Sequence, residues 1–109
     1  MKLSQKQQKF TQDIALLILY IYRNNYSCTF GEAFRTLQQA MWYEQAGKGI
    51  KESLHCKRLA VDLNLFSPDG DYLSDTESHR VFGEFWESLD PKNKWGGRFS
   101  DGNHYQRDE

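Results

Sequence analysis

Residues 59–66 read Leu59-Ala60-Val61-Asp62-Leu63-Asn64-Leu65-Phe66, and this stretch decides the fold that the sequence predicts. Side chains of a β-strand point alternately to its two faces. Every second residue from the first leucine onward is Leu or Val, so one face is apolar. The alternation predicts a strand that packs on the core with one face and presents Asp62 on the other.

Helical patterns lie before and after this strand. In residues 4–24, apolar side chains recur at helical intervals after a capping-box spacing of Ser4 and Gln7. Two further helices are predicted over residues 36–46 and 76–89, each beginning at a threonine that can cap it. The last of them has a core-facing stripe made of Phe82, Phe85, Trp86 and Leu89.

Shorter strands complete the prediction. Residues 26–30 are rich in strand formers, and residues 71–73 can return as a hairpin strand after the turn-forming residues 67–70. Residues 95–105 indicate a turn and short strands. With 109 residues and no internal repeat, the chain fits one domain over residues 1–109. We expect an α+β fold in which helices pack on a small antiparallel sheet.

The charge of the chain is nearly balanced, since 14 basic and 15 acidic residues give a net charge of −1. Nucleic acid is therefore not an expected partner, because its binding normally needs a basic patch. The one long apolar run, residues 14–22, falls short of the roughly 20 residues of a membrane helix and precedes no signal-peptide cleavage site. We expect a monomer without membrane insertion, made in the cytoplasm without a signal peptide.

Three groups that could suggest other chemistry have simpler interpretations. Cys28 and Cys56 lack metal-binding spacing and are expected to be free thiols. His79 lies at the edge of an apolar helical stripe, where a packed and hydrogen-bonded histidine is expected. The acidic residues between 69 and 75 do not fit the EF-hand calcium pattern, so they indicate a polar turn.

The two remaining histidines lie where a metal site needs them. His55 precedes Asp62 by seven residues, at the entry to the same strand. His104 lies in the C-terminal segment, and a turn-prone Gly-Asn pair separates it from Asp101. Two nitrogens and one carboxylate leave a fourth position open on zinc, which is typical of catalytic sites. We therefore expect Zn²⁺ at His55, Asp62 and His104.

Hydrolysis of an amide at such a centre needs two more groups. A carboxylate beside the attacking water can take its proton and pass it to the leaving amine, and Asp101 is the candidate. A cation must stabilise the oxyanion, and Arg35 is the candidate. An ordinary salt bridge remains an equal alternative for Arg35. Glu32 either orients Arg35 or is simply solvated.

Residues 53–63, Ser53-Leu54-His55-Cys56-Lys57-Arg58-Leu59-Ala60-Val61-Asp62-Leu63, resemble the Ser-x-His-x-x-Gly-x-Ala-x-Asp signature of zinc D-Ala-D-Ala carboxypeptidases and phage L-alanyl-D-glutamate endopeptidases. Residues 101–106 are similar to the Asp/Glu-x-x-His segment of this family, and residues 31–36 to the loop that supplies its active-site arginine. Trp95-Gly96-Gly97 also resembles a segment of the phage members. Two departures stand out: Arg58 replaces the usual Gly, and Gln106 replaces a Glu that often follows the last ligand.

The resemblance implies a role for each of these residues. His55, Asp62 and His104 match the zinc ligands, and Asp101 matches the general base. Arg35 matches the residue that stabilises the oxyanion or orients the substrate. Ser53 is expected to contact substrate or to hold the loop near the metal. The implied fold is of the Hedgehog and DD-peptidase type.

The resemblance also implies a function. We expect a zinc metallopeptidase that cleaves the peptidoglycan stem peptide, with the L-alanyl-D-glutamate bond favoured. Such a chain is expected to be a bacteriophage endolysin, made in the host cytoplasm and acting on the cell wall after release. One alternative is a D-alanyl-D-alanine carboxypeptidase. The other is a zinc-containing cell-wall-binding or virion protein without catalytic activity.

Overall fold

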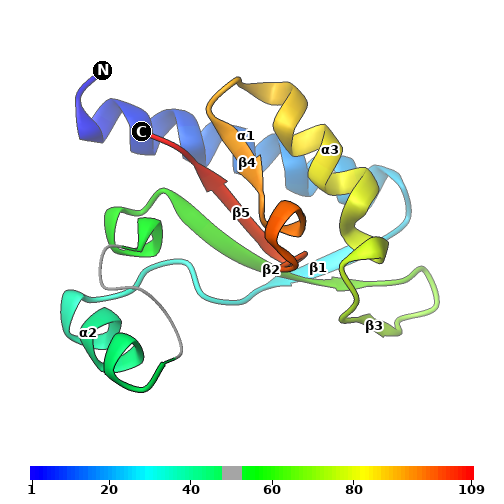
Figure 1. Ribbon diagram of the computed structural model, residues 1–109. Helices are drawn as coiled ribbons and strands as arrows, with labels where there is room; N and C mark the ends of the chain where they lie inside the picture. The colour runs from blue at the N-terminus through cyan, green and yellow to red at the C-terminus, as the bar shows by residue number, and fades with distance from the viewer. Residues whose placement is uncertain (48–52) are drawn as a thin grey trace.

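The computed structural model describes residues 1–47 and 53–109, and it confirms an α+β fold (Figure 1). The sequence also predicts a glycine-containing loop at residues 47–50, and all of it except Gly47 lies outside the described residues. The helices are α1 (Leu3–Arg23), α2 (Leu37–Gln45) and α3 (Arg80–Leu89), with 3₁₀ turns η1 (Leu54–Lys57), η2 (Glu77–His79) and η3 (Gly96–Phe99). The strands are β1 (Ser27–Phe30), β2 (Ala60–Phe66), β3 (Tyr72–Leu73), β4 (Asn93–Trp95) and β5 (His104–Arg107).

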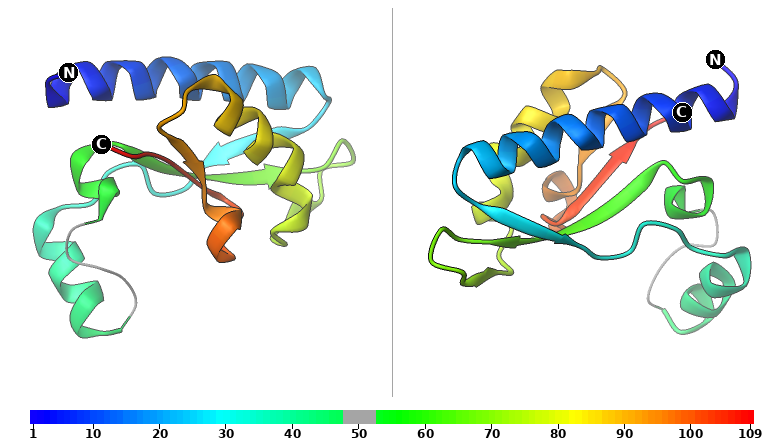
Figure 2. Two further views of the ribbon diagram at one scale, coloured as in Figure 1. Left: turned by 45° about the horizontal axis from the view of Figure 1, so that its top comes forward. Right: turned by 180° about the vertical axis from the view of Figure 1, so that it is seen from behind.

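The strands form one antiparallel sheet around β2. Its order is β1-β2-β5-β4, and β3 pairs with the far end of β2. The helices α1 and α3 cover one face of this sheet, and α2 lies on the opposite side of the sheet (Figures 1 and 2). The sheet therefore has one helix-covered face and one face that is largely open.

The core lies between the sheet and the helices α1 and α3. Its buried members come from every one of these elements: Phe10, Ile14, Leu17 and Ile21 of α1, Phe82 and Trp86 of α3, Leu59, Val61, Leu63 and Leu65 in and before β2, and Trp95 and Tyr105 of β4 and β5. The predicted alternation along residues 59–66 is confirmed, because the buried residues of β2 include every second one. Asp62 is on the other face.

Glycines make room for the central tryptophan of the core. A Cβ at Gly83 would lie 2.1 Å from a ring atom of Trp95, and a Cβ at Gly97 would lie 2.2 Å from another. Trp95 has no exposed surface, and its indole nitrogen donates to the Gly102 carbonyl at 2.8 Å. The indole ring therefore fixes α3, β4 and the C-terminal turn against one another, and only glycine fits at both contacts.

Two predicted helix starts differ from the structure. The helix α1 begins at Leu3, where the Lys2 amide donates to Gln5, and Ser4 instead accepts a hydrogen bond from Gln8. Thr76 has helical dihedral angles and makes no side-chain cap. A carboxylate is a stronger acceptor than a hydroxyl, and Asp75 takes the Ser78 amide at 2.9 Å. The predicted Thr36 cap of α2 is confirmed, with the hydroxyl accepting from the Gln39 amide.

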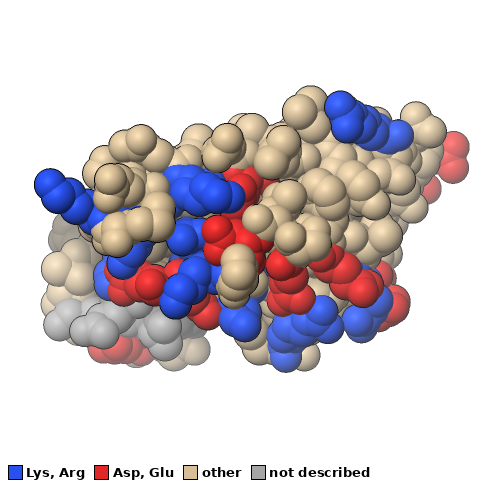
Figure 3. All heavy atoms as spheres, turned by 90° about the horizontal axis from the view of Figure 1, so that it is seen from above, with Lys and Arg blue, Asp and Glu red and all other residues tan. Residues whose placement is uncertain are grey.

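The distribution of charged side chains on the surface agrees with the net charge of −1. On the part of the helix-covered side that the described residues form, basic and acidic side chains are interspersed (Figure 3). Within residues 1–47 and 53–109, no helix is long and apolar enough to cross a membrane. Cys28 and Cys56 are free, as predicted.

Candidate metal centre

The register of β2 and β5 places two of the predicted ligands side by side. Asp62 pairs directly with His104, 42 residues further along the chain. Their neighbours Val61, Leu63 and Tyr105 are core residues, so both side chains project from the open face of the sheet. Directly opposed side chains in an antiparallel pair are close enough to share a ligand.

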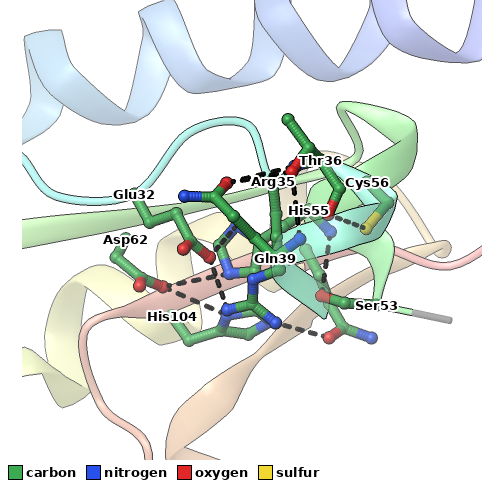
Figure 4. A network of polar contacts seen from close by, with 10 residues as sticks. Glu32, Arg35, Thr36, Gln39, Ser53, His55, Cys56, Asp62 and His104 are labelled. Atoms are coloured by element: carbon green, nitrogen blue, oxygen red, sulfur yellow. Dashed lines mark hydrogen bonds and ion pairs between the residues drawn. The ribbon is translucent and has the colours of Figure 1, made fainter. Parts of the chain in front are cut away.

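The third residue, His55, reaches the same place from a 3₁₀ turn. The sequence predicted it at the entry to the strand, whereas the structure puts it in η1, which folds back before β2. The Ser53 hydroxyl accepts from the His55 amide at 3.2 Å and so holds the start of this turn. The Leu59 amide closes it by donating to the Leu54 carbonyl at 3.0 Å. The imidazole is buried at 3% exposure and points toward Asp62 (Figure 4).

The geometry of the three side chains fits a zinc ion. His55 Nε2 lies 3.5 Å and His104 Nδ1 lies 3.2 Å from the same Asp62 Oδ1. One ligand atom from each of the three residues lies within 4.8 Å of the others. A tetrahedral zinc ion with bonds of about 2.0–2.1 Å holds its ligand atoms about 3.3 Å apart. Within the described part of the chain, these residues form the one group of three or more possible ligands.

His104 is oriented by the residues that follow it. Its Nε2 lies 2.8 Å from Gln106 Oε1, and the Gln106 amide nitrogen donates to Asp108 at 2.6 Å. Since the amide oxygen only accepts, His104 donates to it through Nε2–H, and Nδ1, which faces Asp62, is the ring nitrogen that can bind a metal once it has lost its own proton. Gln106 thus supports the imidazole of His104 from the side away from Asp62.

His55 is flanked by a carboxylate on its other side. Glu32 Oε1 lies 3.5 Å from His55 Nδ1, and Arg35 Nη2 bonds to that same oxygen of Glu32. The Arg35 amide also donates to the His55 carbonyl at 3.2 Å. Residues 32–35, which follow β1, therefore pack directly against η1 and its His55 (Figure 4).

The charges at the centre are strongly coupled. Burial alone would raise the pKa of Asp62, but hydrogen bonds and charges from His104 and His55 outweigh it and lower this pKa to about 2. Burial would likewise lower the pKa of His104, but its bonds to Asp62 and Gln106 and the nearby negative charges raise it. Asp62 is therefore an anion at neutral pH, as a metal ligand must be.

Asp101 lies at the edge of this centre rather than within it. Its side chain is exposed, and its backbone carbonyl accepts from the His104 amide at 3.1 Å. Its negative charge is near enough to help raise the pKa of His104. The turn that carries it depends on Gly96, because a Cβ there would lie 2.2 Å from the Asp101 carbonyl oxygen and 2.7 Å from His104 Cβ.

Arg35 lies beside η1 and makes an ion pair, the ordinary alternative that the sequence left open for it. Its ion pair with Glu32 is present, and its guanidinium also lies 5.0 Å above the ring of Tyr43. The Arg35 Nε is buried, with no hydrogen-bond partner in the part of the molecule that the structure describes. The guanidinium is thus held in place while keeping an unused donor.

Arg58 has a backbone conformation that normally favours glycine. It ends η1 with φ 55° and ψ 38°, in the left-handed region that glycine adopts without strain. Its guanidinium lies 4.0 Å from the ring of Phe34, and both residues line a hollow of about 300 Å³ beside α1. That hollow is not lined by the three candidate ligands.

His79, Cys56 and Asp75, for which the sequence indicates no metal-binding role, lie outside the candidate metal centre. His79 is buried at 2% exposure, and its Nε2 is hydrogen-bonded to the Leu73 carbonyl at 3.1 Å, as predicted. The Cys56 thiol contacts the Thr36 carbonyl. Asp75 caps the turn before α3.

Sequence reasoning missed the residues that surround the ligands. The sequence indicates Glu32 either as a partner of Arg35 or as a solvated residue, and Gln106 as a departure from the resembled signature. The i,i+3 spacing of Glu32 and Arg35 indicated their ion pair, but the contact with His55 follows from tertiary packing. For Gln106, its position two residues after His104 on one strand face was the available signal.

No family model and no curated protein matches this sequence. Among solved structures, the chain is similar to the crystal structure of the Serratia marcescens L-Ala D-Glu endopeptidase ChiX, with a TM-score of 0.74 and 20% sequence identity. The match covers 90% of this chain and 77% of that one. This chain therefore has the same fold as that endopeptidase.

Proposed function

We propose that this protein is a zinc-dependent peptidase that cleaves the peptidoglycan stem peptide, most specifically at the L-alanyl-D-glutamate bond. The observation that carries the proposal is the convergence of His55, Asp62 and His104, with spacing that fits tetrahedral zinc, on the open face of the sheet. The shared fold with an enzyme described as an L-Ala D-Glu endopeptidase supports the choice of bond.

In this proposal His55, Asp62 and His104 hold the ion through Nε2, Oδ1 and Nδ1. Bound zinc supplies a Lewis acid that polarises the scissile carbonyl and makes water nucleophilic at neutral pH. Asp101 takes the proton of the attacking water and passes it to the leaving amine, for which an exposed carboxylate at the rim is suited. Arg35, anchored by Glu32, stabilises the oxyanion or orients the substrate. The Ser53 hydroxyl holds the start of the His55 turn by accepting from the His55 amide, and in this proposal it also contacts substrate.

The biological setting is part of the same proposal. In this proposal the protein is a bacteriophage endolysin that is made in the host cytoplasm. It reaches the wall after release by another factor and acts as a monomer on the stem peptide.

Digestion of purified peptidoglycan tests this function. The zinc-loaded protein should release new amino termini, and mass analysis of the fragments should show cleavage between L-alanine and D-glutamate. A chelator should abolish release, and added zinc should restore it. His55→Ala should bind no zinc and release nothing, whereas Cys56→Ala, next to it in the same turn, should keep both properties.

Each outcome decides between named functions. Loss of terminal D-alanine alone would identify a carboxypeptidase. Zinc-dependent binding to the wall without any new amino terminus would identify a binding protein. Cleavage that survives complete removal of metal would overturn the metallopeptidase proposal.

A further inference from the structure

We infer that Glu32 is a positioning residue that fixes His55 for metal binding and Arg35 for substrate with a single carboxylate oxygen. The inference rests on the proposed metal site and adds a residue to it. It follows from three features of the structure: an unpartnered nitrogen, a backbone anchor and a shared oxygen.

The unpartnered nitrogen is His55 Nδ1. It is buried and has no hydrogen-bond partner among the residues that the structure describes, and Glu32 Oε1 lies 3.5 Å from it. An imidazole that binds metal through Nε2 carries its proton on Nδ1. A buried N–H without an acceptor is costly, and Glu32 is placed to be that acceptor. A small contraction of this distance on metal binding would complete the hydrogen bond.

The backbone anchor ties Glu32 to the ligand Asp62. The Asp62 amide donates to the Glu32 carbonyl at 2.8 Å, and the Gly31 amide donates to the Asp62 carbonyl at 2.8 Å. These two bonds continue the β1–β2 pairing by two residues beyond the strand. The backbone of Glu32 is therefore held beside the candidate ligand Asp62, and the ion pair with Arg35 holds its side chain.

The shared oxygen couples His55 to Arg35. Glu32 Oε1 faces His55 Nδ1 and also accepts from Arg35 Nη2. The pair is only partly exposed, with 24% for the Glu32 side chain and 15% for that of Arg35. Removing the carboxylate would leave a half-buried guanidinium without its counter-charge and His55 without its acceptor. One substitution should therefore affect both metal binding and substrate orientation.

The two imidazoles differ in this outer support. His104 has a neutral amide, Gln106, whereas His55 has a carboxylate, which favours a more basic ligand nitrogen. Glu32→Gln keeps an acceptor and removes the charge, and Glu32→Ala removes both. Loss of such a partner typically weakens metal binding by about 10–100-fold. We expect zinc affinity to fall by about 10-fold in Glu32→Gln and by about 100-fold in Glu32→Ala.

Zinc titration against a chromogenic chelator measures these affinities on the full chain. Glu77→Gln is the matched control, because Glu77 and Arg80 form the same i,i+3 ion pair at exposed positions and neither residue is one of the three candidate ligands. This control should bind zinc like the wild type. ¹⁵N NMR of the zinc-loaded protein should show a slowly exchanging Nδ1 proton on His55 that disappears in Glu32→Ala.

The outcomes separate this inference from the proposed function. If the wild type binds no zinc, the metal site itself is wrong. If the wild type binds zinc and both Glu32 variants bind it equally well with the Nδ1 proton retained, the metal site stands and the positioning role of Glu32 is overturned. A loss of affinity shared by Glu77→Gln would show a general effect of charge and would also overturn it.

Discussion

The two faces of the central strand β2 carry different side chains: one face is apolar and buried, and the other is more polar and partly exposed. On the helix-covered face, Val61, Leu63 and Leu65 are at most 3% exposed and hold the fold by packing. On the open face, Asp62 lies between two imidazoles and next to a Glu32–Arg35 pair. The contrast shows that the packed core and the candidate metal site lie on opposite sides of one strand. Substitutions on one side should therefore leave the property of the other largely intact.

Among substitutions that leave the three candidate ligands intact, the largest effect is expected at Asp101, beside the open face. Asp101→Asn should lower turnover on peptidoglycan by about 10²–10⁴-fold, because the amide cannot accept the proton of water. Zinc affinity and melting temperature should stay close to wild type, since the side chain is exposed and is not one of the three ligands. Steady-state rates and zinc titration measure the two properties.

Asp69→Asn, in the turn after β2, is the control for this substitution and should retain full activity. If the Asp101→Asn variant were fully active, the general base would have to be another residue.

The helix-covered face should respond in the opposite way. Gly83→Ala places a methyl group against the rigid indole of Trp95, so the helix and the ring must move apart. We expect a loss of about 1–3 kcal/mol in the free energy of unfolding, the usual cost of overpacking. Well below its melting temperature the variant should still bind zinc. Denaturant unfolding measures the stability.

Val81→Ala, at a 54% exposed position of the same helix, should change stability far less. If the two variants were equally stable, the space between α3 and the Trp95 ring would accommodate a methyl group at residue 83, contrary to the close contact in the structure.

His79 and His104 should give the stability of metal-free protein opposite pH dependences, because their surroundings shift their pKa values in opposite directions. Burial lowers the pKa of His79, so the unfolded chain binds more protons than the folded one. The stability that neutral His79 contributes is present above about pH 6.5 and is lost as the pH falls. The pKa of His104 is raised, so its contribution is present at low pH and is lost as the pH rises through that pKa.

Unfolding of His79→Gln and His104→Gln between pH 5 and pH 8 tests this difference. Relative to wild type, the cost of His79→Gln should shrink toward low pH, and the cost of His104→Gln should shrink toward high pH. Parallel curves for both variants would contradict the assignment of the two histidines to different environments.

The smallest effect is expected at Arg58, where the two faces meet at the end of η1. Arg58→Ala keeps the left-handed strain and loses the contact with Phe34, whereas Arg58→Gly loses the contact and relieves the strain. The glycine variant should be more stable than the alanine variant by about 1 kcal/mol. Thermal unfolding of both variants decides it, and a more stable alanine variant would rule out the strain.

Much of this molecule was predictable from local patterns. Period-two alternation in residues 59–66 fixed which face of the strand carries Asp62, and helical spacing indicated the stripe that buries Phe82 and Trp86. Helix starts were less predictable, because neighbouring side chains such as Asp75 compete with Thr76 for the same free amides.

The sequence by itself determined the composition of the candidate site: two histidines and an aspartate in a recognisable order, with Asp101 and Arg35 nearby. Only the tertiary structure decided their geometry. The pairing of Asp62 with His104, the fold-back of η1 that brings in His55, and the placement of Glu32 each join segments far apart in the chain. Local propensity acts over a few residues, so it cannot specify a register that depends on how distant strands bury their apolar faces together.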